Sequence, residues 1–330
     1  MFYNGVNFDD KCVLITGGAG FIGSNLAFYF QENYPRCKVV VFDRFRDGKR
    51  FPNGNPKSYG HFKNLIGFKG IVISGDITNK DDLQRLKEYK FDYIFHEAAI
   101  SDTTIDDQKI MIDTNVNAFT DILKMAKEMK SSLIYASSAA TYGDSDIFKV
   151  GYEKPNNAYG FSKLMMDNIA REYMKDGDID IVGLRYFNVY GEREYYKGKT
   201  ASMILQFGLQ LLKGSKAKLF VGSDEIKRDF VYIEDVIQAN IKACKPKKSG
   251  IYNVGTGEAR SFQKIVDILK FELDIDREDS YIVNPYKKQY QYFTQADISL
   301  TREFLEYNPS FSLEKGIRTY LPEIRKIAKR

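Results

Sequence analysis

The sequence of 330 residues has few of the side chains that bind metals or form cross-links. Its three cysteines, Cys12, Cys37 and Cys244, are widely spaced and form no CxxC pair, so neither a disulfide framework nor a zinc site is indicated. Because His61 and His96 are the only histidines, a histidine metal cluster or a serine triad is not expected. A GxSxG nucleophile motif is also missing. We therefore expect no bound metal and no serine-hydrolase chemistry.

The sequence also has no long apolar run and no strong excess of one charge. No stretch reaches the roughly 18 consecutive apolar residues of a membrane span, and the first residues lack a basic region followed by an apolar one. The net charge of +5 comes from 49 basic and 44 acidic residues along the whole chain, which does not indicate nucleic-acid binding. We expect a cytoplasmic protein that binds neither membranes nor nucleic acid. The mild positive charge favours an anionic ligand.

Short runs rich in β-branched residues alternate with amphipathic segments through the first half of the chain. Six such runs are predicted to be strands: residues 12–16, 38–43, 70–74, 93–96, 132–137 and 180–185. The clearest helices between them are predicted at residues 24–34, 113–129 and 162–174. The alternation predicts an α/β fold with a doubly wound parallel sheet.

A glycine-rich loop, GGAGFIG, follows the first predicted strand. Gly17, Gly20 and Gly23 allow a tight turn, close approach of the backbone to a pyrophosphate, and close packing of helix on sheet. Ser24 opens the predicted helix, whose N-terminus then faces the phosphates. Asp43 ends the second strand, where an acid accepts a hydrogen bond from the adenosine ribose. These residues predict a Rossmann-type site for a nicotinamide dinucleotide.

The residues after Asp43 bear on the choice between NAD and NADP. An acid at this place usually indicates NAD, but Arg44, Arg46 and Arg50 follow it closely. Guanidinium groups there would bind a 2′-phosphate bidentately and offset its repulsion by the acid. We therefore expect NADP, with NAD less favoured. The structural alternative for this cluster is an exposed basic turn.

After Gly191 the sequence becomes rich in turns and mixed charges. Helices are predicted at residues 200–213, 234–245, 261–273 and 313–328, and an apolar run at 251–254 is predicted to return to the sheet as a further strand. No long flexible linker separates the two halves. We place the Rossmann domain at residues 1–189 and 228–257, and a smaller α/β substrate-binding lobe at residues 190–227 and 258–330.

Tyr159 and Lys163 have the spacing of an acid/base pair in the sequence AYGFSK. Positions i and i+4 of a helix share a face, so the ammonium group can favour the phenolate and lower the tyrosine pKa from about 10. Ser138 follows the fifth strand at the carboxyl edge of the sheet, where ligands bind in such folds. Together with the glycine loop these residues predict redox chemistry at an alcohol or ketone. The YxxxK motif alone is equally compatible with an ordinary amphipathic helix.

With Ser138, Tyr159 and Lys163 in this order after TGGAGFIG, the chain resembles the extended short-chain dehydrogenase/reductases of the NAD-dependent epimerase/dehydratase family. The resemblance covers nearly the whole chain. Within that family the chain is most similar to the ADP-L-glycero-D-manno-heptose 6-epimerases, in the stretches SSAATYG, EKPNNAYGFSK, RYFNVYGEREYYKG, FVGSDEIKRDFVYIEDV and YQYFTQAD. The resemblance implies an NADP-dependent enzyme that inverts C6″ of ADP-heptose. It also implies a homo-oligomer, commonly a pentamer, that supplies heptose for the lipopolysaccharide inner core.

The resemblance assigns roles to individual residues. Inversion at C6″, an unactivated carbinol, requires oxidation to a 6″-ketone and return of the hydride to the other face, with acid/base groups on both sides. By resemblance these groups are Tyr159 and Lys197, while Lys163 holds the nicotinamide ribose and Ser138 binds the substrate oxygen. The implied cofactor contacts further include Phe21, Ile22, Arg44, Arg50, Lys80, Ala98, Ala99, Ser101, Asn115, Val189 and Lys197. The implied sugar-nucleotide contacts are Asn188, Phe220, Val221, Gly222, Ser223, Arg228 and Tyr290.

The chain departs from the family pattern at several positions. Lys199 and Gln206 occupy substrate positions where the family has a small hydroxyl residue and a histidine. The connection at residues 50–68 is longer than usual for the family and has no assigned role. The alternative to a ligand-binding role for Arg228 is a structural role, in a salt bridge with Asp229 or Asp235.

Three other functions are open on this scaffold. A 4,6-dehydratase needs an acid just after the strand-five serine, commonly an Asp-Glu pair, and Ala139 and Ala140 stand there instead. This observation weakens the dehydratase hypothesis but leaves a sugar-nucleotide 4-epimerase possible. A non-catalytic NADP sensor is the third alternative, and the intact set of Ser138, Tyr159 and Lys163 argues against it.

Overall fold

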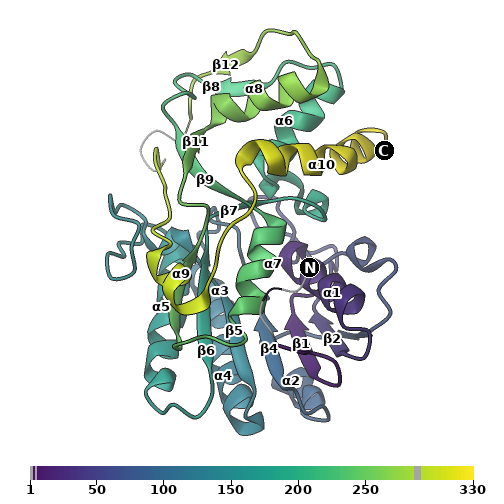
Figure 1. The fold of residues 1–330 in the computed structure, drawn as a ribbon, viewed down its shortest axis with the longest axis vertical. Helices are drawn as coiled ribbons and strands as arrows, with labels where there is room; N and C mark the ends of the chain where they lie inside the picture. The colour runs from purple at the N-terminus through teal and green to yellow at the C-terminus, as the bar shows by residue number, and fades with distance from the viewer. Residues whose placement is uncertain (1–2, 4–5, 286–290) are drawn as a thin grey trace.

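A seven-stranded parallel sheet forms the centre of the molecule (Figure 1). The computed structural model describes residues 3, 6–285 and 291–330. The strand order is β10-β6-β5-β4-β1-β2-β3, and it reverses beside β1. The strands are β1 (Cys12–Thr16), β2 (Lys38–Asp43), β3 (Ile71–Ser74), β4 (Tyr93–His96), β5 (Ser132–Ser138), β6 (Ile181–Tyr186) and β10 (Gly250–Val254). This order confirms the predicted doubly wound fold, including the additional strand near residue 251.

Alternation of side chains along the strands gives the sheet two buried faces. In β1, Val13 and Ile15 join the apolar cluster that contains Leu26 of α1 (Phe21–Asn33). Leu14 points to the other face and joins the cluster that contains Phe119 of α4 (Ala118–Met129). Because both faces are covered by helices, the strands are nearly continuous apolar runs rather than alternating ones.

Shorter elements build a second, smaller layer above the carboxyl ends of the strands (Figure 1). One sheet joins β7 (Asn188–Tyr190), β9 (Lys227–Tyr232) and β11 (Ala259–Ser261), and another joins β8 (Lys218–Phe220) and β12 (Ser280–Ile282). The helices α6 (Met203–Leu212), α8 (Phe262–Leu273) and α10 (Leu313–Ala328) pack together beside them. The remaining helices are α2 (Lys80–Leu86), α3 (Gln108–Met111), α5 (Ala158–Met174), α7 (Ile233–Lys242) and α9 (Ser299–Leu305). The domain boundaries given above stay a prediction.

Four predicted helix starts are wrong by a few residues, including that of α6, which begins at Met203 rather than at residue 200. Helix α1 begins at Phe21 rather than at residue 24, because Gly20 is its extended N-cap and the Ser24 amide already bonds Gly20 O at 3.2 Å. Helix α5 begins at Ala158, where the Asn157 side chain accepts a hydrogen bond from the Gly160 amide at 2.8 Å. Before α4, a π-helical segment, Ile112–Asn117, continues directly from α3. Because α5 begins at Ala158, Tyr159 lies in the first turn of this helix.

A buried cluster of charges fixes α5 against the sheet. Arg185 of β6 donates to Asp167 Oδ2 of α5 through Nε at 2.9 Å and Nη2 at 2.7 Å, and it pairs with Glu153 at 2.6 Å. The Tyr135 hydroxyl donates to the other Asp167 oxygen at 2.8 Å. Both Arg185 and Asp167 are fully buried. Asp167 lies four residues after Lys163, so the cluster also fixes the part of α5 that carries this lysine.

None of the helices in the described part of the chain is long and apolar enough to cross a membrane.

We expect Asp167→Ala to lower the free energy of unfolding by about 3–5 kcal/mol, because it leaves the Arg185 charge buried with part of its compensation removed. Urea denaturation measures this change. Asp121→Ala is the control: it removes a carboxylate from an exposed pair with Lys124 at 3.8 Å, and we expect a loss below about 1 kcal/mol. An unchanged unfolding midpoint for Asp167→Ala would show that apolar packing alone holds α5.

Candidate active site

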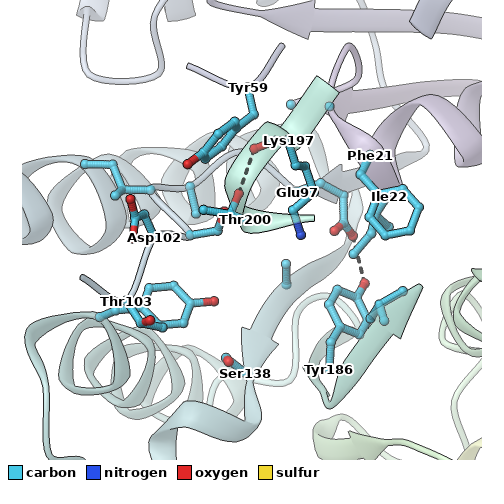
Figure 2. Close-up of a pocket in the computed structure, with 18 of the residues that line it drawn as sticks. Phe21, Ile22, Tyr59, Glu97, Asp102, Thr103, Ser138, Tyr186, Lys197 and Thr200 are labelled. Carbon is cyan, nitrogen blue, oxygen red and sulfur yellow. Dashed lines mark hydrogen bonds between the residues drawn. The ribbon is translucent and has the colours of Figure 1, made fainter. Parts of the chain in front are cut away.

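A cleft of about 570 Å³ lies at the carboxyl ends of the central strands, below the smaller layer (Figure 2). It is at the place where the strand order reverses, which is where doubly wound folds bind ligands. The predicted site residues that line it are Gly17, Gly20, Phe21, Ile22, Gly23, Asp43, Arg44, Ala98, Ala99, Ser101, Ser138, Tyr159, Lys163, Asn188, Val189, Lys197 and Arg228.

The glycine loop forms a cradle that only glycines allow. Gly17 has φ +68°, and a Cβ there would lie 2.7 Å from the Ala98 amide nitrogen. A Cβ at Gly23 would lie 2.4 Å from Gly17 O. Phe21 and Ile22, in the first turn of α1, line the cleft, and their amides have no helical acceptor. The loop therefore fits the pyrophosphate of a nicotinamide dinucleotide.

Asp43 holds this loop to the end of β2. Its buried carboxylate accepts hydrogen bonds from the amides of Ala19 at 2.9 Å and Phe45 at 2.8 Å. Burial raises the pKa of this carboxyl, and the two amides act in the opposite direction. Asp43 lines the cleft and each of its oxygens keeps a further lone pair, so it can accept the predicted bond from a ribose hydroxyl.

The predicted basic residues near Asp43 do not converge on one point. Arg44 lines the cleft and pairs with Asp76 at 3.2 Å and with Asp47 at 3.7 Å. The Arg50 guanidinium instead donates to Gly54 O at 2.8 Å within its own loop. Lys80 is exposed at the start of α2 and is not among the residues lining the cleft.

Asn115 lies behind the cleft rather than in it. It is fully buried, its Oδ1 accepts from the Ile100 amide at 2.8 Å, and its Nδ2 donates to Ile100 O and to Ser162 Oγ, both at 3.0 Å. These bonds join the segment after β4, which lines the cleft, to α5. Asn115 therefore positions the site in this structure.

Tyr159 and Ser138 both line the cleft, close enough for the Ser138 hydroxyl to affect the pKa of the Tyr159 phenol. Burial raises this pKa, the Ser138 hydroxyl lowers it and the Glu97 carboxylate raises it, so that the pKa is raised overall. The predicted lowering by Lys163 is therefore wrong. The Lys163 ammonium lies 5.9 Å from the centre of the Tyr159 ring and donates to Ala136 O at 2.6 Å.

Lys163 is itself strongly affected by burial. Burial lowers its pKa to about 8, and the carboxylates of Glu97 and Asp167 act in the opposite direction. A lysine with such a pKa exchanges its proton near neutral pH.

Lys197 reaches the cleft from another part of the chain. It belongs to a short 3-10 segment, Tyr195–Thr200, and its ammonium points into the cleft (Figure 2), 5.5 Å from the centre of the Phe21 ring. Burial lowers the pKa of Lys197, and Glu194 raises it. Buried Glu194 anchors the segment by accepting from the amide and hydroxyl of Ser202 at 2.6 and 2.7 Å. The alternative of an ordinary surface lysine is therefore wrong.

Glu97 is a cleft residue that sequence reasoning missed. The Tyr186 hydroxyl donates to Glu97 Oε1 at 2.9 Å (Figure 2), and Asn240 Nδ2 donates to that hydroxyl at 2.9 Å. Burial raises the pKa of Glu97 to about 7, against the bond from Tyr186 and the Lys163 charge. A signal was present: Glu97 directly follows a predicted strand in the sequence FHEAA.

Among the predicted substrate residues, Asn188 and Arg228 line the cleft. Buried Arg228 donates through Nη1 to Lys227 O at 2.9 Å and through Nη2 to Gln291 O. Asp229, which was one alternative salt-bridge partner for Arg228, accepts hydrogen bonds from the amides of Thr256 and Gly257 at 2.7 and 2.8 Å.

The other predicted substrate residues lie outside this lining. Phe220, Val221, Gly222 and Ser223 follow or end β8. Lys199 is exposed, and Gln206 Nε2 donates to Ala201 O at 2.7 Å. Tyr290 lies outside the described residues.

In residues 3, 6–285 and 291–330, no group of three or more His, Cys, Asp or Glu side chains is arranged to hold a metal ion.

The chain belongs to the NAD dependent epimerase/dehydratase family, whose model matches residues 13–255. Fold and cleft thus define an enzyme of the nicotinamide-dependent epimerase class. The chain is 51% identical to ADP-L-glycero-D-manno-heptose-6-epimerase of Helicobacter pylori, with a TM-score of 0.89, over 98% of this chain and 99% of that one.

More distant relatives have the same architecture. UDP-glucuronic acid 4-epimerase of Bacillus cereus, solved with UDP-glucuronic acid and NAD, is 26% identical over 96% of this chain and 100% of that one, with a TM-score of 0.80. UDP-glucose 4-epimerase of Thermotoga maritima shares the fold at 24% identity, over 96% of this chain and 99% of that one, with a TM-score of 0.84.

We expect Glu97→Gln to stabilise the cofactor-free protein more at pH 8 to 9 than at pH 5. The Glu97 pKa is about 7 in the fold against an ordinary 4.5, so folding favours the protonated carboxyl. Its contribution is complete below the ordinary pKa and is lost as the pH rises through about 7. An amide stays neutral throughout. Melting temperatures of both proteins across this range measure the difference, and equal differences at every pH would contradict the assignment.

Proposed function

We propose that the protein converts ADP-D-glycero-D-manno-heptose to ADP-L-glycero-D-manno-heptose by inverting C6″. The observation that carries the proposal is the presence of the Tyr159–Ser138 pair and the Lys197 ammonium in one cleft beside a dinucleotide cradle. The 51% identity to the Helicobacter pylori enzyme, over almost the full length of both chains, supports the choice of substrate.

The two proton-exchanging groups have complementary tasks in this reaction. A nicotinamide dinucleotide held in the glycine loop would supply the hydride acceptor and donor for this inversion. Tyr159 accepts the hydroxyl proton of one epimer, Lys197 donates the proton that forms the other, and the reverse reaction exchanges these roles. Ser138 orients the oxygen by a hydrogen bond. Lys163 holds the nicotinamide ribose, and Asn188 and Arg228 bind the sugar nucleotide.

The same scaffold also carries dehydratases and 4-epimerases. Ala139 and Ala140 line the cleft directly after Ser138, at the place where a dehydratase needs an acid, and this observation favours epimerisation. A 4-epimerase is the second candidate, and the position of the inverted carbon in the product distinguishes it from our proposal.

The preferred cofactor is NADP, with NAD less favoured. Of Arg44, Arg50 and Lys80, it is Arg44 that lines the cleft, next to Asp43. Its guanidinium already pairs with Asp76 and Asp47, so the 2′-phosphate would either displace these carboxylates or share the guanidinium with them.

We further place the enzyme in the cytoplasm as a homo-oligomer, a pentamer by resemblance. Its product is the heptose donor for the lipopolysaccharide inner core.

Incubation of the NADP-loaded enzyme with ADP-D-glycero-D-manno-heptose in deuterated water tests the function. We expect NMR to show the C6″ epimer without deuterium at any carbon, because the hydride returns from the cofactor. Deuterium at C5″ would indicate enolisation, and inversion at C4″ would establish the second candidate.

The combined Tyr159→Phe and Lys197→Met variant should abolish epimerisation in this assay while the cofactor still binds. Near-normal rates in that variant would contradict the two-base assignment.

We expect Arg44→Ala to weaken binding of NADP by about tenfold or more and to leave NAD binding nearly unchanged. The reason is the loss of a charge-assisted bond to the 2′-phosphate. Calorimetric titration with both cofactors measures the change. Lys80→Ala is the matched control, since this cation lies outside the cleft lining. An equal loss for NADP and NAD would contradict the assignment of Arg44.

A further inference from the structure

The long connection after β2 forms an ordered segment that we call the strap, residues 46–61. It is closed at its base by a hydrogen bond from the Arg46 amide to Gly60 O at 3.0 Å. Further along, Lys57 N bonds Lys49 O at 3.0 Å, and Phe51 N bonds Asn55 O at 2.8 Å. These bonds give the strap the form of a hairpin rather than of an irregular loop.

The strap supplies one side of the cleft. Its residues Phe51, Pro56, Lys57, Ser58, Tyr59 and Gly60 all line the cavity. In Figure 2, Tyr59, Asp102 and Thr103 lie on one side of Thr200 and Lys197, and Glu97 and Tyr186 lie on the other.

Asp102 ties the tip of the strap to the segment after β4. Its Oδ2 accepts from Asn53 Nδ2 at 3.0 Å and from Asn55 Nδ2 at 2.7 Å. Its Oδ1 accepts from the amide and hydroxyl of Thr104 at 2.9 and 2.7 Å. Asp102 is buried while Asn53 is exposed, so these bonds are partly shielded from water.

The strap contacts both segments that carry the proton-exchanging groups. Phe51 is buried in one apolar cluster with Tyr159, Ile100 and Met111. At the other end, Arg46 donates to Tyr196 O at 2.6 Å, and the His61 ring stacks on the Tyr196 ring with centroids 3.9 Å apart. Tyr196 directly precedes Lys197.

We propose that the strap retains the ketone intermediate in the cleft while its carbonyl turns between Tyr159 and Lys197. This inference rests on the proposed function. The first half-reaction breaks the C6″–H bond, transfers its hydride to the oxidised cofactor and transfers the hydroxyl proton to Tyr159 or Lys197. If the ketone leaves at that point, one ketone appears in solution for each reduced cofactor left on the protein, and the second half-reaction cannot follow. A side of the cleft fixed by Asp102 and Phe51 prevents this loss.

The test releases the tip of the strap with the double variant Asn53→Ala/Asn55→Ala. Enzyme loaded with oxidised NADP is given ADP-D-glycero-D-manno-heptose. Reduced nicotinamide is measured by its absorbance. Released ketone is measured in a protein-free filtrate, after capture as its hydrazone. Both amounts are divided by the amount of epimerised product. We expect the variant to lose ketone about tenfold or more often per turnover than the wild type, with equal amounts of ketone and reduced cofactor. The loss should be progressive, and added oxidised NADP should restore activity.

The matched control is Asn117→Ala/Asn168→Ala, which removes two exposed asparagine side chains away from the cleft. We expect it to behave as the wild type. If releasing the tip unfolds the protein, Phe51→Leu keeps the apolar contact but removes the ring beside Tyr159, and it should increase ketone loss by a smaller factor.

The two proposals fail in different ways. Equal ketone loss in the wild type and in the folded strap variants, with normal C6″ inversion, would overturn the retention role alone. Absence of both product and reduced cofactor in the wild type would overturn the function and the retention role together.

Discussion

Removal of water from the cleft is the physical effect on which the proposed chemistry depends. Burial disfavours charge, so it lowers the pKa of Lys163 to about 8, lowers that of Lys197, and raises that of Glu97 to about 7. Lys163 and Glu97, which would otherwise stay ionised, thereby become able to exchange protons near neutral pH. For Tyr159 the same effect acts in the unhelpful direction, and the Ser138 hydroxyl opposes it. In the proposed reaction the serine would therefore assist the tyrosine as well as orient the substrate oxygen.

The sequence determined the sheet and the glycine loop well, because both follow from local patterns. β-Branched runs and a glycine turn after β1 depend on neighbouring residues, and the expected strands were found within a residue or so. Helix starts were less predictable, since they depend on caps such as Gly20 and Asn157. The three-residue strands of the smaller layer, such as β8, are too short to show any periodicity.

Side-chain directions could not be predicted from spacing. The i, i+4 rule correctly placed Lys163 beside Tyr159, with its ammonium 5.9 Å from the ring centre, but it could not show that the ammonium donates to Ala136 O of β5. Arg50 was predicted to contact the cofactor from its position after Asp43, yet its guanidinium bonds Gly54 O because the strap folds back on itself. Such partners depend on how the surrounding chain folds, whether in a local loop or across the sheet, and a motif cannot specify them.

The segment that carries Lys197 is placed mainly by the elements around the cofactor cradle. Asn25 of α1 donates to Glu192 O at 2.9 Å, and Arg193 donates to Asn64 O at 2.7 Å. Asn64 in turn donates to Ala19 O of the glycine loop at 3.1 Å. Tyr159, by contrast, is placed through α5 and its buried pair with β6. The two proton-exchanging groups are thus attached to different parts of the Rossmann fold. A segment that contacts both parts would hold the two groups in place relative to each other. The strap makes that contact, since it reaches Tyr159 through Phe51 and Tyr196 through Arg46.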